Sequence, residues 1–391
     1  MTTPNELEEL YTLPSYAKLN VALERGAGSF VWDEKGRRFL DFYGGHCVTA
    51  IGHCPPKVVE AIRDQATELI FYSNAVYSPL RGRAAKRLID LCPEHIVQAF
   101  FCNSGTEANE AALKMARKTT GRMRVIAMDG GFHGRTLGSL AVTSGTSYRS
   151  PYESLLGGVT FVPFGDLDAV AQVIASDEVA GVILEPIQSM AGVVLAEPEY
   201  YRKLADMTAS AGALLIFDEV QTGVGRTGTF TLAEQLGVKP DVVTLAKSLG
   251  SGVPVGAAVV GRRVADAVKL GDHGSTFGGG MIAMAAMDAT LETVGEPGVM
   301  ERASPIFEQI RATADEVGFV TLGRGCLIGI DAGFDCREIR SGLFDAGVLV
   351  GSSSNPNVMR LFPPLTTSDE EVELFRDALL SVVASASTLP N

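Results

Sequence analysis

The sequence lacks the features of a secreted or membrane-spanning protein. Residues 1–10 are polar and acidic, with no basic stretch followed by an apolar run, so no signal peptide is expected. No apolar run approaches the roughly 18 residues that cross a membrane. The six cysteines are scattered without the dense spacing of a disulfide framework, which favours reduced thiols. These absences predict a cytoplasmic protein.

Positive charge is also scarce. The chain carries 33 lysines and arginines against 46 acidic residues, a formal net charge of -13. Because an acidic surface repels phosphate backbones, nucleic acid is not expected as a partner. Repeats and low-complexity tracts are absent as well. The length of 391 residues instead predicts two globular domains, each with its own core.

The middle of the chain alternates apolar strands with amphipathic helices. Such an order predicts an α/β fold with a mostly parallel sheet that helices cover on both faces. The expected helices are Thr106–Lys118 and Tyr200–Ser210. The expected strands are Ala99–Cys102, Val125–Met128, Val159–Phe164, Val182–Leu184, Ala213–Phe217, Val242–Leu245 and Ala257–Val260.

The two ends of the chain have a different pattern, typical of a small α+β domain. A strand pair is expected at Ser29–Asp33 and Arg38–Asp41. The C-terminal part is expected to hold helices at Pro305–Val317 and Glu370–Ala384, with strands at Leu327–Ile330, Val348–Val350 and Val358–Leu361. We therefore predict a large domain over residues 53–295. Residues 1–52 are predicted to pack with a small domain formed by residues 296–391, and turn residues around Pro297 suggest that boundary.

Three polar groups follow strands of the predicted sheet. Ser104-Gly105-Thr106 opens a helix directly after a strand, Asp218 ends an apolar strand, and Lys247 follows another. The carboxyl ends of parallel strands meet at one edge, where ligands bind. A helix N-terminus suits a phosphate group, a buried acid needs a partner, and a desolvated lysine is a good nucleophile. Pyridoxal phosphate requires all three groups, which makes it the predicted cofactor.

Each of these residues also has a purely structural interpretation. Thr106 would serve equally well as a helix cap, Asp218 as a loop ion-pair partner, and Lys247 as a surface lysine with a partly buried stem. The prediction of a cofactor site therefore depends on the three groups occurring together.

Other patterns in the chain point to other functions. Gly223–Gly228 fits G-x-G-x-x-G and would indicate an NAD-dependent oxidoreductase, but Thr229-Phe230-Thr231 does not open the helix that a dinucleotide site needs. The chain contains no Gly-Lys pair, which excludes an ATPase phosphate loop. The adjacent pairs His46-Cys47 and His53-Cys54 lack zinc-ligand spacing, so no metal is expected.

Several longer stretches identify a family resemblance. The stretches are Asn103–Lys118 (NSGTEANEAALKMARK), Gly131–Thr136 (GFHGRT), Glu185–Gln188 (EPIQ), Leu215–Arg226 (LIFDEVQTGVGR), Leu245–Pro254 (LAKSLGSGVP) and Gly274–Gly279 (GSTFGG). They resemble the class III aminotransferases, acetylornithine and ornithine aminotransferases in particular, from about Gly28 to Ala384. The resemblance implies the type I fold of pyridoxal-phosphate enzymes, with a seven-stranded sheet in the large domain, and a homodimer with shared active sites.

The resemblance also implies roles for single residues. Lys247 would carry the cofactor and move the substrate proton, while Asp218 would keep the cofactor's ring nitrogen protonated. Further cofactor contacts would come from Ser104, Gly105 and Thr106 at the phosphate, Phe132, Glu185 and Gln221 at the ring, and Thr276 of the other subunit. Substrate contacts would come from Arg360 at a carboxylate and from Arg135, Tyr77 and His46.

The implied reaction is transfer of the amino group of an ornithine-type ω-amino acid, with or without an N-acyl group, to 2-oxoglutarate, as in arginine biosynthesis. A transaminase with another donor, and a decarboxylase or epimerase on the same fold, remain alternatives. The chain departs from the family pattern at Ser189-Met190, where the family has Gly-Glu, and at Gly280-Met281, where it has Asn-Pro. The missing glutamate would pair with Arg360, so Arg360 is expected to stay available to substrates.

Overall fold

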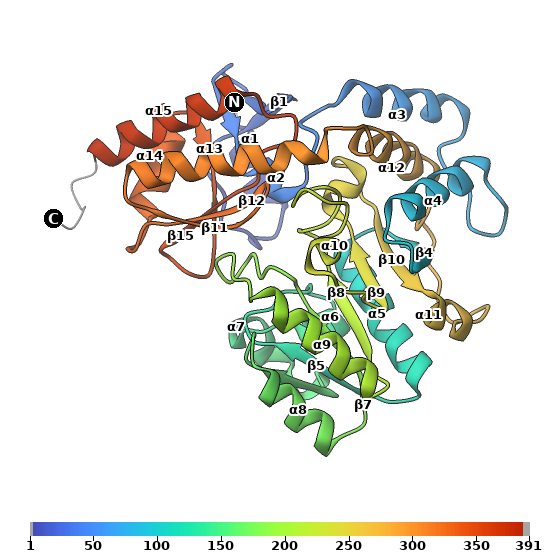
Figure 1. The fold of residues 1–391 in the computed structure, drawn as a ribbon. Coiled ribbons are helices and arrows are strands. Elements are labelled where there is room, and N and C mark those ends of the chain that lie inside the picture. Colours follow the sequence, from blue (N-terminus) through green and yellow to red (C-terminus); the bar gives the residue numbers. More distant parts are fainter. Residues whose placement is uncertain (1–2, 386–391) are drawn as a thin grey trace.

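A seven-stranded sheet forms the centre of the computed structural model, which describes residues 3–385 (Figure 1). Its strand order is β4-β10-β9-β8-β7-β5-β6. Only β10 runs antiparallel to its neighbours, so the expected α/β class and mostly parallel sheet are confirmed. The strands are β4 (Ile96–Cys102), β5 (Arg124–Met128), β6 (Val159–Val162), β7 (Val179–Leu184), β8 (Leu214–Asp218), β9 (Val242–Leu245) and β10 (Gly256–Gly261).

Both faces of this sheet are apolar because alternate residues of each strand enter different cores. In β8, Leu214 and Ile216 join one core, whereas Leu215 and Phe217 join the other. Helix α5 (Gly105–Thr120) covers the first face with its alanines, and α9 (Pro198–Ser210) covers the second face. A strand buried on both sides reads as a continuous apolar run, which is the pattern the sequence shows here.

The remaining helices of this part pack around the sheet. Helix α12 is buried along most of its length and packs against α3 and α4. The bounds are α3 (Pro56–Glu68), α4 (Pro79–Leu91), α6 (Leu137–Val142), α7 (Thr146–Arg149), α8 (Leu167–Ser176), α10 (Leu232–Leu236), α11 (Arg262–Ala267) and α12 (Met281–Val294). In the described range, 3–385, no helix combines the length and the apolar character needed to cross a membrane.

Two four-stranded sheets lie beside the large one, in the part coloured blue and orange to red in Figure 1. One has the order β1-β2-β3-β13 and the other β11-β12-β15-β14. Their strands are β1 (Leu23–Ala27), β2 (Phe30–Asp33), β3 (Arg38–Asp41), β11 (Val320–Arg324), β12 (Leu327–Asp331), β13 (Val348–Leu349), β14 (Gly351–Ser352) and β15 (Val358–Leu361). The accompanying helices are α13 (Ala303–Glu316), α14 (Arg337–Asp345) and α15 (Asp369–Ser385).

The pairing of β3 with β13 joins the two ends of the chain in one sheet. The strand expected at Val348–Val350 is divided, because β13 pairs with β3 whereas β14 pairs with β15 in the other sheet. The expected domain boundaries stay a prediction, and their terminal residues 1–2 and 386–391 lie outside the described residues.

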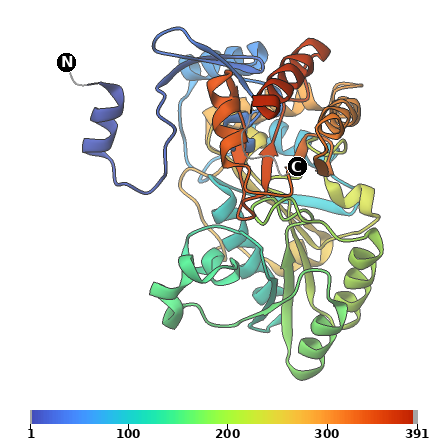
Figure 2. The same ribbon diagram turned by 90° about the vertical axis from the view of Figure 1, so that its left-hand side faces the viewer.

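Helix α1 (Pro4–Tyr11) stands away from the rest of the chain (Figure 2). A capping box at Thr3 and Glu6 and a proline in the first turn start the helix, yet none of its residues is buried. Its apolar residues Leu7, Leu10 and Tyr11 are exposed.

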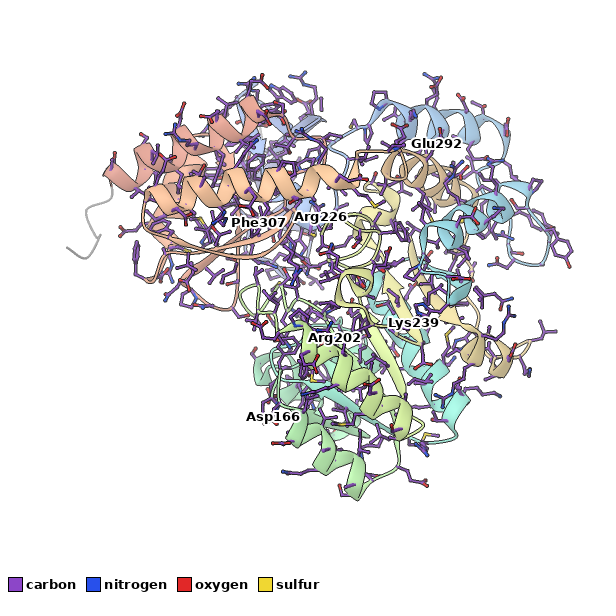
Figure 3. All side chains as sticks on the ribbon, viewed as in Figure 1. Asp166, Arg202, Arg226, Lys239, Glu292 and Phe307 are labelled. Atoms are coloured by element: carbon purple, nitrogen blue, oxygen red, sulfur yellow. The ribbon has the colours of Figure 1, made fainter. Side chains whose placement is uncertain are left out.

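A group of ion pairs joins α12 to α4. Asp288 on α12 accepts from Arg83 at 2.8 Å and from Arg87 at 2.6 Å, and its side chain is 11% exposed. Glu292, labelled on α12 in Figure 3, also pairs with Arg87, but its side chain is 50% exposed. Because shielding from water strengthens an ion pair, Asp288 should contribute more to stability than Glu292.

We expect Asp288→Ala to lower the free energy of unfolding by about 1 kcal/mol, because two partly exposed arginines lose their shared partner. Glu292→Ala on the same helix should cost less than about 0.5 kcal/mol. Urea denaturation of both variants checks the difference. Equal decreases in the free energy of unfolding would show that the burial of Asp288 does not strengthen its ion pairs.

Candidate active site

A cavity of about 410 Å³ lies at the carboxyl ends of β4, β7, β8 and β9. Most of the predicted site residues line it, as the position of these strand ends requires. They are Ser104, Gly105, Thr106, Phe132, Arg135, Glu185, Asp218, Gln221 and Lys247.

The N-terminus of α5 forms one wall of the cavity. Ser104 caps this helix, since its hydroxyl accepts from the backbone N–H of Glu107 at 3.3 Å. The Thr106 hydroxyl instead bonds that of Thr136 at 2.8 Å, so Ser104 and not Thr106 has the capping role. At Gly105 a Cβ would come within 2.9 Å of Val220. Because Ser104, Gly105 and Thr106 line the cavity, the positive end of the helix dipole faces it, and an anion binds favourably there.

Asp218 is buried at the end of β8 and is held on three sides. Its Oδ2 contacts His133 Nδ1 at 2.8 Å and Asn109 Nδ2 at 2.7 Å, and its Oδ1 accepts from the backbone of Val220. Burial would raise the pKa of Asp218, but the hydrogen bonds and charge of His133 outweigh it, and the pKa lies below its ordinary value. Asp218 is thus an ionised acid inside the cavity.

His133 and Asn109 were not predicted as site residues. His133 lies within the Gly131–Thr136 motif, and nothing in the sequence indicated that its side chain would contact the distant Asp218. Asn109 carried a usable signal, because it is a polar residue on the alanine-rich buried face of α5. Thr244 in β9 donates to Asn109 Oδ1 at 2.8 Å and so fixes which end of the amide faces Asp218. The three side chains together orient the carboxylate.

Glu219, the next residue, is also buried but has the opposite pKa shift. Its carboxylate accepts from the backbone N–H groups of Leu232 and Ala233 at the start of α10. Burial raises the pKa of Glu219 to about 7 in spite of these bonds. Glu219 does not line the cavity, so its role is to attach α10 to the end of β8.

This shift predicts a pH dependence of stability. A carboxyl whose pKa rises on folding, here from an ordinary 4.5 to about 7, stabilises the protein most below pH 4.5, and this contribution is lost as the pH rises through 7. The loss amounts to about 3 kcal/mol. Urea denaturation from pH 4.5 to 8 should show a smaller decrease for Glu219→Gln than for the wild type. The exposed Glu199→Gln serves as control, and an unchanged slope in Glu219→Gln would contradict the assignment.

Lys247 lies two residues after the end of β9, in a left-handed conformation with a φ of 44°. Burial lowers the pKa of Lys247, although the Cys47, Asp218 and Glu185 side chains oppose the shift. Its amine forms no hydrogen bond or ion pair with any residue in the range 3–385. The surface interpretation of Lys247 is wrong, because the residue lines the cavity.

Glu185 follows β7 and accepts from the backbone N–H of Phe132 at 2.8 Å. Burial raises the pKa of Glu185 to about 7, and the nearby Asp218 adds to this shift. Gln221 Oε1 is buried without a hydrogen-bond partner among the described residues. An unpaired buried oxygen is costly, so a ligand that donates a hydrogen bond fits at Gln221.

The other four predicted residues lie outside this cavity. Arg360 and His46 are nevertheless near Lys247, because after burial the charges of Lys247 and Arg360 lower the pKa of His46, and the charge of Arg360 lowers that of Lys247. Tyr77 and Thr276 are exposed, and Tyr77 lines a separate hollow with the neighbouring Ser275. Among residues 3–385 no group of His, Cys, Asp and Glu side chains is arranged to bind a metal.

The cavity fits pyridoxal phosphate. The helix end can hold the phosphate, the ionised Asp218 can face a protonated ring nitrogen, Gln221 can accept from the ring hydroxyl, and Lys247 offers an amine of lowered pKa. Fold and site together define a pyridoxal-phosphate enzyme.

Comparison with known proteins gives the family. The chain matches the model of the aminotransferase class-III family over residues 11–383 and belongs to that family. It is 42% identical to the acetylornithine aminotransferase of Methanopyrus kandleri, over 94% of this chain and 95% of the relative. The acetylornithine aminotransferase of Streptomyces coelicolor is 41% identical, over 95% of this chain and 93% of its own.

Solved structures agree. The ornithine aminotransferase of Toxoplasma gondii superimposes with a TM-score of 0.92 and 28% identity, over 98% of this chain and 96% of that one. The protein is therefore an aminotransferase that works with pyridoxal phosphate.

Proposed function

We propose that the protein transfers the amino group of an ornithine-type ω-amino acid, free or N-acylated, to 2-oxoglutarate, as a step of arginine biosynthesis. One observation carries the substrate class. Arg360 is 1% exposed, close to Lys247, and has no acidic partner in the range 3–385. A buried guanidinium is costly without an anion, and both an ω-amino acid and a keto acid bring a carboxylate. The names of the relatives support the donor.

Arg360 is held by neutral groups. Its Nε donates to the Ser352 carbonyl at 2.6 Å, and one terminal nitrogen donates to Ser189 Oγ at 3.0 Å. Met190, in place of the family glutamate, offers no charge that could pair with Arg360. The second terminal nitrogen is therefore available to a carboxylate in both halves of the reaction.

When bound, pyridoxal phosphate supplies the carbonyl group that binds the amine and the ring that accepts electrons. Lys247 would accept the proton from the substrate carbon and later release it, because burial lowers the pKa of its amine and so favours the neutral form that can accept a proton. Asp218 would hold a negative charge opposite the ring nitrogen. The phosphate would be held by Ser104, Gly105 and Thr106. Phe132, Glu185 and Gln221 would surround the ring, and Arg135 would contact the distal end of the substrate.

Thr276 and Tyr77 would act across a homodimer. Both are exposed in the single chain. Thr276 belongs to the loop that includes Ser275 and Gly278, and Tyr77 lines a hollow together with these two residues. We place them at the active site of a second copy, where Thr276 reaches the phosphate and Tyr77 the substrate.

The roles of Lys247 and Asp218 are separable by mutation. Lys247→Ala should abolish transfer and the borohydride-reducible adduct while leaving the thermal midpoint almost unchanged. Asp218→Asn should keep the adduct on Lys247 but lower kcat by about 100-fold or more, because an amide cannot hold the charge. Peptide mapping after reduction and steady-state kinetics check both. A near-normal rate in either variant would remove that residue from its role.

Product analysis with and without 2-oxoglutarate tests the proposed function. Ornithine or N-acetylornithine should yield a semialdehyde and glutamate, and turnover beyond one equivalent should require the keto acid. Continued release of carbon dioxide or an inverted amino acid without 2-oxoglutarate would instead indicate a decarboxylase or epimerase. Another amine consumed at a higher kcat/KM would assign a different donor.

A further inference from the structure

The glycine-rich segment Gly223–Gly228 has no part in the proposed reaction, yet its backbone is held in a strained shape. Val224 has a φ of 59°, in the left-handed region that β-branched residues rarely adopt, and its side chain is 1% exposed. Its backbone N–H donates to the Phe230 carbonyl at 2.8 Å. Backbone strain of this kind persists only where the surrounding structure enforces it. We call this segment the glycine loop.

The glycine loop is packed between the two strands that lead to the active-site lysine and carry the carboxylate-binding arginine. A Cβ at Gly223 would lie 2.6 Å from the side chain of Leu245, the last residue of β9. A Cβ at Gly225, whose φ is 81°, would lie 3.2 Å from the side chain of Leu365, which follows β15. Glycine permits this close approach on both sides because it has no side chain.

Arg226 links the same two strands through its side chain. It is fully buried and is labelled in Figure 3. One terminal nitrogen donates to the Pro363 carbonyl at 2.7 Å, and the other donates to Ser248 Oγ at 3.5 Å. Pro363 lies three residues after Arg360. Ser248 directly follows Lys247. One guanidinium therefore connects the segment that carries the lysine with the strand that carries the carboxylate-binding arginine.

The backbone of Arg226 adds a third link. Its carbonyl accepts from the backbone N–H of Cys326 at 2.8 Å, in the turn between β11 and β12. Strand β12 pairs with β15, and in that pairing Gly329 lies opposite Arg360. The end of β15 and its neighbouring strand are thus both held by the residue that contacts Ser248.

Burying Arg226 is costly in free energy, because it forms no ion pair with an acidic side chain in residues 3–385. Its Nε is buried without a hydrogen-bond partner among these residues. An apolar side chain of similar size would fill the same space at less cost, but it could not hold two polar groups. The contacts of Arg226 therefore favour a role in fixing the separation of Pro363 and Ser248 over a role in packing alone.

We propose that Arg226 and the glycine loop are a positioning element for the reaction, which sets the separation between the Lys247 amine and the Arg360 guanidinium. A substrate that carries both an amine and a carboxylate is then recognised at both groups together. Arg226 does not line the cavity, so it is a positioning residue that acts through Lys247 and Arg360. The inference rests on the proposed function only in that Arg360 binds a carboxylate.

Two alkoxyamines test this inference on the cofactor-loaded enzyme. Aminooxyacetate carries a carboxylate and O-methylhydroxylamine does not. Each forms a C=N bond to the carbonyl carbon of the cofactor and releases the Lys247 amine, which changes the visible absorbance. The ratio of the two rate constants measures how well a bound amine and a bound carboxylate fit together. Because both rates are taken on the same sample, the amount of folded, loaded protein cancels from the ratio.

Wild type should react about 30-fold faster with aminooxyacetate, the effect expected of hydrogen bonds to a charged group. Arg226→Gln is too short to hold both partners and should lower this preference about tenfold, because a small displacement separates the two groups from their substrate positions. Arg226→Lys should lower it about threefold, since a single ammonium can keep Pro363 as its partner but not Ser248 as well. The rate with O-methylhydroxylamine should stay within about twofold of wild type in both variants.

Arg302→Lys is the matched control. Arg302 donates to the Thr367 carbonyl at 2.7 Å, also in the segment after β15, and within residues 3–385 it has no hydrogen bond to the loop that follows Lys247. Its preference should stay within about twofold of wild type. Ser248→Ala removes the second partner of Arg226 and should lower the preference about threefold, and the double variant Arg226→Lys/Ser248→Ala should be no worse than Arg226→Lys.

Amide hydrogen exchange of the purified protein gives a readout that does not depend on activity. In Arg226→Gln, peptides that cover residues 245–250 and 358–365 should both exchange faster than in wild type, because both segments lose a shared contact. Arg302→Lys should leave the exchange of residues 245–250 unchanged.

Several results would overturn the inference. They are an unchanged preference in both Arg226 variants, an equal slowing with both alkoxyamines, faster exchange in only one of the two segments, and a wild type without preference for aminooxyacetate. If Arg226→Gln does not fold, Arg226→Lys and Ser248→Ala decide the outcome. If the preference depends on Arg226 but wild type does not convert ornithine, the proposed donor fails and the inference stands.

Discussion

The buried carboxylate of Asp218 is the interaction on which the site depends. It ends a strand that is apolar on both faces, where a charge without partners would be too costly to keep. His133 and Asn109 provide those partners and lower the pKa of Asp218. Glu219, one residue on, also accepts hydrogen bonds, and burial still raises its pKa. Neutral donors alone therefore do not outweigh burial, and the hydrogen bond and charge of His133 account for the difference at Asp218.

Much of this arrangement was predictable from the sequence. Continuous apolar strands indicated a parallel sheet, and the rule that ligands bind at strand ends brought Ser104, Asp218 and Lys247 to one place. The sequence did not indicate contacts between residues that are far apart in the chain. The antiparallel direction of β10 and the division of the strand at Val348–Val350 depend on partner strands, which local periodicity does not encode. His133 was missed for the same reason.

The substrate side was less predictable than the cofactor side. Arg360 was expected, but its neutral partners Ser189 and Ser352 follow from tertiary packing. Residues Gly44–Cys47 form a turn with left-handed backbone angles, and the Asp41 carboxylate accepts from three backbone N–H groups at its start. No residue pattern marks this turn. Thr276 and Tyr77 are exposed in the isolated chain, so their roles stay a prediction that needs a second copy. The cofactor side of the site uses polar groups at the ends of sheet strands, whereas the expected substrate contacts come from scattered parts of the chain.

The pairing of β4 with β10 has a consequence for how the enzyme is made. The two strands are neighbours in the sheet, yet all the other strands of this sheet, β5 to β9, lie between them in the sequence. Ser104 follows the first strand and Lys247 precedes the second, so the two ends of the cofactor site meet only when this long loop closes. Long-range pairing of this kind is slow, because chain entropy is lost before the contacts form. During refolding, the yellow colour of bound cofactor should therefore appear after most of the helical signal, and the free chain should pass through a stage that is compact but unable to bind cofactor.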